Sequence, residues 1–301
     1  MIWWLEATLV GALGGLIGVQ IVLRRLAFFT MALTHATFPG VVAAAIIGVN
    51  IYLGGALAGV LVALGVAALS RGRGQGPAAA TGVLLSGGFA LGVGLVATQD
   101  GFRLDLSSFL VGSILSVSHR DVVTTAVVLV VVAVVLGALA RPLRLTGFDP
   151  DSARAAGVNV RAVDLTLLLT VEVVIVTVVP AVGTILALAL LVAPAAAARL
   201  WSSRLAVITP LAMAFGVASG AIGLAVSTHW EVAAGAAITL TATGFLLVSL
   251  ALSRAWPATP AQTRSRSAAP TQAEPAAPPA APTRAEPAEP APTRAGPGSG
   301  R

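Results

Sequence analysis

The chain has 301 residues, of which 57% are hydrophobic and only 10% are charged, and its formal net charge is +6. Soluble domains carry roughly 25% charged residues, so a soluble fold of this length could not cover its surface with so few polar groups. Cysteine is absent, which excludes disulfides and thiolate metal sites, and the arginines are too scattered to form a nucleic-acid-binding patch. The composition therefore indicates an integral membrane protein surrounded by lipid, with no nucleic-acid partner.

Apolar runs of about 20 residues are typical of membrane-spanning helices. Nine such runs follow one another along the chain, at 5–23, 26–49, 52–70, 78–98, 122–140, 165–182, 183–198, 205–226 and 232–253. The apolar piece at 109–115 is too short to span a bilayer. The sixth and seventh runs can also be read as one broken pair, which leaves eight to ten spans open. We expect an all-α, polytopic transmembrane helical bundle of about nine spans.

Arginine sets the orientation of these spans, because loops on the cytoplasmic side of a membrane are enriched in basic residues. One side of the nine-span arrangement holds only Arg103 and Arg120. The other side collects the remaining arginines between spans: Arg24, Arg25, Arg71, Arg73, Arg141, Arg144, Arg154, Arg161, Arg199, Arg204 and Arg254. The pattern predicts an N-terminus outside and a C-terminus in the cytoplasm.

The second run contains a histidine, His35, four residues before Pro39-Gly40. Ionisable groups in a bilayer usually face a cavity or the bundle interior, and a Pro-Gly pair is typical of a discontinuous helix near a transport path. Neutral imidazole is also a common ligand for zinc, manganese and iron. Two interpretations stay open: His35 is a metal ligand, or it forms a hydrogen bond between helices.

The polar segment between the fifth and sixth spans contains a short helix signal. Asp149 suits the N-cap, Pro150 suits the first helical position, and Gly157 suits the end of the helix. The signal predicts a short rigid helix on the arginine-rich side, of the kind that docks into a partner. The alternative is a plain connecting loop.

The sixth span carries Glu172 inside an apolar run, where it either binds a cation in transit or serves as a protonated structural group. Pro180 and Pro194 predict further helix breaks. Several polar residues are expected on the outer side, where ordinary loop polarity explains each of them: Asp100, Asp105, His119, Asp121, His229 and Glu231.

Three stretches of the chain resemble the zinc/manganese/iron-type permeases of ABC transporters. They are His-Ala-Thr-Phe-Pro-Gly at 35–40, Phe-Asp-Pro-Asp-Ser-Ala-Arg-Ala-Ala-Gly at 148–157, and the segment 181–199 around Pro194. Their order and spacing also fit, and the resemblance covers about residues 5–253. It implies a permease subunit in a bacterial plasma membrane that imports a divalent metal ion as substrate, with no permanently bound cofactor.

The resemblance also implies partners and residue roles. Two permease copies would pair above two copies of a cytoplasmic ABC ATPase, and an extracellular metal-binding solute receptor would deliver the ion. His35 and Glu172 would lie on the metal path, with the helix break at Pro39 and Gly40 beside it. The segment 148–160 would be the coupling helix seated in the ATPase, through Asp149, Pro150, Asp151, Arg154, Ala155 and Gly157.

One position departs from the family pattern, which commonly has an Asp four residues before the motif histidine. Here that position is Met31. A thioether is a soft, neutral ligand that is poorly matched to manganese. Either the carboxylate comes from elsewhere, with Glu172 the best candidate, or His35 acts as a gate, or the substrate differs from the usual ions.

Other functions remain as alternatives at this stage. An ABC permease for a metal chelate or cofactor shares this kind of coupling helix, and a proton-coupled secondary transporter could use Glu172 as its proton carrier. An intramembrane enzyme ranks last, because no catalytic motif is present. The chain has no lysine and so cannot form a P-loop. We therefore expect a transport subunit, residues 1–256, followed by a disordered cytoplasmic tail rich in Pro and Ala, residues 257–301.

Overall fold

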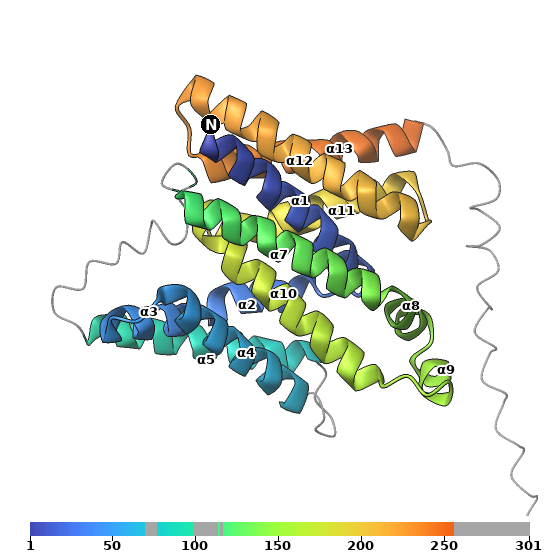
Figure 1. Ribbon diagram of the computed structural model, residues 1–301, viewed down its shortest axis with the longest axis horizontal. Helices are drawn as coiled ribbons and strands as arrows, with labels where there is room; N and C mark the ends of the chain where they lie inside the picture. Colours follow the sequence, from blue (N-terminus) through green and yellow to red (C-terminus); the bar gives the residue numbers. More distant parts are fainter. Residues whose placement is uncertain (70–76, 99–113, 115–116, 256–301) are drawn as a thin grey trace, which may run out of the picture. The chain divides into compact units, whose positions relative to one another are not determined.

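The computed structural model describes residues 1–69, 77–98, 114 and 117–255, and these residues contain long α-helices and no β-strand (Figure 1). The all-α prediction is confirmed. The helices, in chain order, are α1 (Ile2–Leu23), α2 (Ala27–Ala36), α3 (Phe38–Ile47), α4 (Ile51–Leu69), α5 (Pro77–Ala97), α7 (His119–Ala138), α8 (Ala140–Phe148), α9 (Pro150–Ala155), α10 (Val160–Val182), α11 (Thr184–Trp201), α12 (Leu205–Trp230) and α13 (Ala234–Ala255).

The expected membrane spans correspond closely to these helices. Within the described residues, seven helical stretches are long and apolar enough to cross a bilayer, and two shorter apolar helices, Ile51–Val66 and Ala187–Trp201, occupy the places of the third and seventh expected spans. The expectation of about nine spans agrees with this pattern. The short apolar piece at 109–115 lies outside the described residues except for Ile114, and the predicted tail at 257–301 lies outside them entirely.

The expected break at Pro39-Gly40 is smaller than the sequence suggested and lies earlier. A single turn residue, Thr37, separates α2 from α3, and its backbone is still α-helical (φ −73°, ψ −21°). Pro39 is the second residue of α3, where a missing N–H costs no helical hydrogen bond. Residues 27–47 therefore form one nearly continuous span, and its break lies at Thr37, two residues before the predicted position.

The two proline breaks expected later in the chain are also absent. Pro194 lies inside α11, and Pro180 lies within the last turn of α10. The chain bends instead at Gly183, between α10 and α11, where a φ of 91° is in the region that glycine adopts readily. The sixth and seventh apolar runs are thus two helices joined at one glycine.

Helix α1 occupies the centre of one helix group, because it packs against α12, α11 and α7 (Figure 1). Its contact with α12 depends on glycine: a Cβ added at Gly11 would overlap the backbone of Gly216, and one added at Gly216 would overlap Gly11. Small residues allow this close helix approach in lipid, where no hydrophobic force between helices exists. Almost every residue of α1 from Glu6 to Ile21 is buried as a result.

A second group of helices consists of α3, α4 and α5, which pack against one another and lie together in Figure 1. Gly40 belongs to this packing, because a Cβ there would overlap the backbone of Gly54 on α4. Helix α10 contacts both groups: it packs against α4 and α2 on one hand and against α1 and α7 on the other. Side chains on α10 are therefore placed between the two groups.

Candidate functional site

Glu172 lies on α10 at the contact with α4, and its side chain is 1% exposed. The carboxyl group rests directly against the backbone of α4 at Gly59, where an added Cβ would occupy the same space as the carboxyl oxygens. Neither oxygen has a hydrogen-bond partner in the described part of the chain. A buried carboxylate without partners is strongly unfavourable. Its ionised form at this position therefore requires a counter-charge.

His35 lies on α2, half-buried, with its ring edge-on to Phe89 of α5 at 6.2 Å between centroids. Among the described residues its imidazole has no hydrogen-bond partner, so the interhelical hydrogen bond considered from the sequence is not formed with them. Met31 is half-buried one helical turn earlier on the same face of α2. Neither ring nitrogen is therefore engaged by another described residue.

His35 and Glu172 have different nearest neighbours, although their helices α2 and α10 pack against each other. The histidine ring faces α5, and the glutamate lies against α4. No group of three or more His, Cys, Asp or Glu side chains arranged to hold a metal occurs in the described residues. His35 and Glu172 are therefore separate polar side chains in an apolar interior, and they do not complete a metal site with several protein ligands.

A cavity of about 1270 Å³ opens at the arginine-rich end of the helices, below Glu172. Its lining includes Phe29 of α2, Leu64 of α4 and Leu168 of α10. Leu168 is four residues from Glu172, and Leu64 is five residues from Gly59, so the lining stops about 6–8 Å short of the Glu172–Gly59 contact along each helix. Glu172 is therefore not part of the lining, and it lies about one helical turn beyond the inner end of this cavity.

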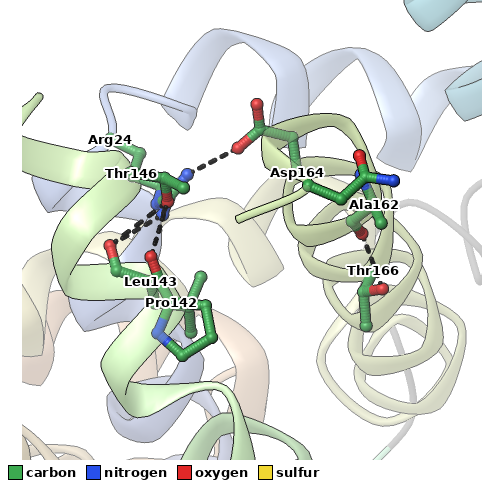
Figure 2. A network of polar contacts seen from close by, with 8 residues as sticks. Arg24, Pro142, Leu143, Thr146, Ala162, Asp164 and Thr166 are labelled. Atoms are coloured by element: carbon green, nitrogen blue, oxygen red, sulfur yellow. Dashed lines mark hydrogen bonds and ion pairs between the residues drawn. The ribbon is translucent and has the colours of Figure 1, made fainter. Parts of the chain in front are cut away.

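Arg24, another lining residue of the cavity, is fully engaged in a polar network (Figure 2). Its guanidinium donates to the Asp164 carboxylate on α10 at 2.7 Å, to the Leu143 carbonyl at 2.9 Å and to the Thr146 hydroxyl at 2.6 Å. The contacts join the end of α1 to α8 and to the start of α10. Sequence reasoning missed this network, because its members are separated by more than 100 residues.

The short helix predicted on the arginine-rich side is α9. The Asp149 carboxylate accepts hydrogen bonds from the backbone N–H groups of Asp151 and Ser152 at 3.0 and 3.1 Å, and Pro150 is the first helical residue. The Ser152 hydroxyl also donates to Asp149, which lowers the pKa of that carboxyl. Gly157 ends the turn with a φ of 79°. The predicted capping pattern is confirmed.

The remaining residues of this segment present a charged surface. Arg154 forms an ion pair with Asp151 one turn earlier, and both side chains are exposed. Ala155 is exposed, whereas Ala153 is buried. The helix thus shows solvent a rigid face with both signs of charge.

At the opposite end of the helices the structure reveals a residue that sequence reasoning overlooked, Glu6 of α1. Glu6 is 1% exposed, and one of its oxygens accepts a hydrogen bond from the Thr125 hydroxyl of α7 at 2.7 Å. The other oxygen, Oε2, has no partner among the described residues. The available signal was an acidic residue within an apolar run, the same signal that singled out Glu172.

Comparison with known proteins gives a consistent picture over nearly the whole described chain. A model of the ABC 3 transport family matches residues 2–253. The manganese transport system membrane protein MntC of Halalkalibacterium halodurans is 37% identical over 236 residues, which are 78% of this chain and 81% of that protein. The zinc transport system membrane protein TroC of Treponema pallidum is 34% identical over 250 residues, covering 79% and 83% of the two chains.

A solved structure has the same helix arrangement. PsaBC from Streptococcus pneumoniae, determined in complex with a Fab, superposes with a TM-score of 0.74 at 32% sequence identity. The match covers 82% of this chain and 89% of that chain. The fold described above is therefore shared with a protein of known structure.

Proposed function

The chain belongs to the ABC 3 transport family, and we propose that it is the membrane-spanning permease subunit of an ABC transporter that imports a divalent metal ion, namely manganese, zinc or iron. The relatives at 34–37% identity are named as manganese and zinc transport proteins of bacteria, and a third, 30% identical, as a probable iron transport protein. The match to an ABC family favours an ATP-driven mechanism over the proton-coupled secondary transport that the sequence left open.

The observation that carries the proposal is Glu172, a fully buried carboxyl without a partner among the described residues, one helical turn beyond the inner end of a cavity. Intramembrane ionisable groups of this kind are typical of ion pathways. We assign Glu172 and His35 to the metal path. The ion meets these two side chains one after the other, because they lie on neighbouring helices but face different neighbours. The cavity at the arginine-rich end is its exit to the cytoplasm.

The pair also accounts for Met31. The family pattern places an aspartate there, and in this chain the carboxylate is supplied from α10 by Glu172. A mixed imidazole and carboxylate environment suits manganese, zinc and iron, whereas the thioether of Met31 is a poor ligand for manganese. Met31 then provides apolar packing beside the path. Pro39 and Gly40 shape the path indirectly, because they hold α3 against α4.

Energy comes from a partner. The chain has no lysine and cannot build a P-loop, so a separate cytoplasmic ATPase hydrolyses the ATP. Helix α9 is the coupling helix that docks into it, through the Asp149 cap, Pro150, the Asp151–Arg154 pair and Ala155, with Gly157 closing the turn. The subunit pairs with a second copy of itself, receives metal from an extracellular solute receptor, and has its C-terminus in the cytoplasm of a bacterium.

Elemental mass spectrometry of cells grown under metal limitation tests the proposal. Loss of the gene is expected to lower the cellular content of one of the three metals, and the wild-type gene is expected to restore it. The variants His35→Ala and Glu172→Gln are expected to restore less than a tenth of the difference, at normal protein levels in the membrane.

Two control variants carry the same substitutions at positions outside the proposed metal path. His229→Ala and Glu231→Gln change exposed residues at the end of α12, and both are expected to restore the metal content fully. No change in any of the three metals on loss of the gene would refute metal import. Full restoration by both His35→Ala and Glu172→Gln would remove these residues from the path.

A further inference from the structure

A ladder of polar side chains lies at the end of the helices opposite Arg24, where α1, α4 and α7 begin. The Tyr52 hydroxyl of α4 donates to the Asp121 carboxylate of α7 at 3.2 Å. One turn further along α7, the Thr125 hydroxyl donates to Glu6 of α1 at 2.7 Å. Asp121 and Thr125 are four residues apart and share a face of α7. The four side chains therefore connect three helices in one polar line.

Exposure falls steadily along this line from the surface inward. Tyr52 is 39% exposed, Asp121 is half-buried, and Thr125 and Glu6 are each 1% exposed. The line ends on Glu6 Oε2, which has no partner among the described residues. A polar path from solvent that ends on an unused buried acceptor gives a cationic ligand both access and an oxygen to bind.

The local structure of α7 explains part of this arrangement, but only part. Asp121 belongs to the capping box of α7, because it accepts hydrogen bonds from the backbone and hydroxyl of Ser118 at 2.9 and 2.7 Å. Capping does not involve Glu6. The neighbouring threonine, Thr124, donates to the carbonyl of its own helix at Arg120, whereas Thr125 donates to Glu6 instead. The Thr125 contact thus serves to fix the Glu6 carboxyl.

The two carboxylates also have no counter-charge within the described part of the chain. Neither Glu6 nor Asp121 takes part in an ion pair with another described residue. We propose that Glu6, Thr125 and Asp121 form a second binding site for the divalent cation, at the outer end of the bundle. This inference rests on the proposed function, which supplies the ion and the outward orientation of this end.

The ligand chemistry defines the kind of ion. The site offers carboxylate and hydroxyl oxygens and no imidazole, which suits a hard divalent cation such as Mn²⁺ with water completing its shell. Two carboxylates make a weak site compared with a closed metal cage. Weak binding fits a passing ion, because a transported ion must leave each site it occupies. The outer site would hold the ion before it moves inward to His35 and Glu172.

Manganese binding by the purified full-length chain in lipid nanodiscs tests the site separately from transport. Free Mn²⁺ is measured by electron paramagnetic resonance during titration with MnCl₂, in a His35→Ala/Glu172→Gln background that removes the inner site. In this background Glu6→Gln is expected to weaken Mn²⁺ binding at least tenfold. The Gln side chain keeps an acceptor for Thr125, so the fold should be preserved, and gel-filtration elution checks this.

A second pair of variants keeps the test decisive if Glu6→Gln fails to fold. Thr125→Val removes the hydroxyl that holds Glu6 and is expected to weaken Mn²⁺ binding several-fold. Thr124→Val is its matched control, because that hydroxyl bonds only within its own helix, and it should bind Mn²⁺ like the background. Binding that is unchanged in both Glu6→Gln and Thr125→Val, or equally weakened in Thr124→Val, would overturn the assignment.

A failure of the outer-site proposal can be distinguished from a failure of the proposed function. If loss of the gene changes no cellular metal, metal import itself is wrong. If cellular metal does fall on loss of the gene and Glu6→Gln still binds Mn²⁺ like its background, only the outer site is wrong.

Discussion

The Arg24 guanidinium and the Glu172 carboxyl are both largely buried, and their surroundings are opposite. Arg24 contacts α10 from the end of α1, whereas Glu172 belongs to α10 and rests against α4. Arg24 donates to a carboxylate, a carbonyl and a hydroxyl, so its charge is matched and its hydrogen bonds are used (Figure 2). Glu172, two helical turns beyond Asp164 on the same helix, has no such partner among the described residues. A satisfied charge fastens helices together, whereas an unsatisfied one is available to a ligand that comes and goes.

The largest effect is expected at Gly59, the residue against which Glu172 rests. In Gly59→Ala the new methyl group would overlap the carboxyl, so either α4 and α10 separate or Glu172 leaves its position. We expect metal uptake to fall at least tenfold. The matched control is Gly94→Ala, because an added Cβ there meets nothing within 4 Å; its uptake should be close to wild type.

A double variant sharpens this prediction. Gly59→Ala/Glu172→Ala removes the group with which the new methyl collides, so thermal stability in detergent should recover toward wild type while uptake stays low. Recovery of uptake in the double variant would show that Glu172 only fills space between α4 and α10. The distinction between a structural Arg24 and a metal-binding Glu172 would then be wrong.

An intermediate effect is expected at Arg24, and it should appear in stability. Arg24→Met removes hydrogen bonds from a charged donor to three partners, and the free energy of unfolding should fall by about 2 kcal/mol. Asp164→Asn should cost less, because the Asp164 side chain is 49% exposed and keeps contact with water. Arg25→Met, an exposed neighbour, serves as the control. Chemical denaturation in detergent measures all three, and an equal response of Arg24→Met and Arg25→Met would contradict the assigned role.

The smallest effect is expected at helix α9 and concerns the pH dependence of its cap. The Ser152 hydroxyl, as the leading cause, lowers the pKa of the Asp149 carboxyl below its ordinary value of about 3.9. Because the pKa is lowered in the folded protein, the ionised Asp149 cap stabilises α9 at every pH above the ordinary pKa. This stabilisation is lost as the pH falls through the lowered pKa. In a ¹³C-NMR titration Ser152→Ala should move the Asp149 transition upward, with Asp149→Asn used to assign the signal. An unchanged transition would exclude the Ser152 hydroxyl as the cause.

Helix α9 and the helix break near His35 show how far local signals reach. Asp149, Pro150 and Gly157 act within one or two turns, so their pattern predicted the start and end of α9 correctly. Pro39-Gly40 was given too much weight, because a proline in the first turn of a helix removes no hydrogen bond, and the chain continues with only a turn at Thr37. In both helices, α3 and α9, the proline thus lies in the first turn.

The sequence by itself determined the membrane character of this protein, its helices, the side on which arginine collects, and Glu172 and His35 as candidates. These properties depend on hydrophobicity and on hydrogen bonds between residues three or four positions apart, which the chain order records directly. Only the tertiary structure decided that Arg24 meets Asp164, that Glu6 meets Thr125, and that the Glu172 carboxyl rests against Gly59. These pairings join residues more than 100 positions apart, and they depend on how glycine-lined helices approach one another, which no local pattern encodes.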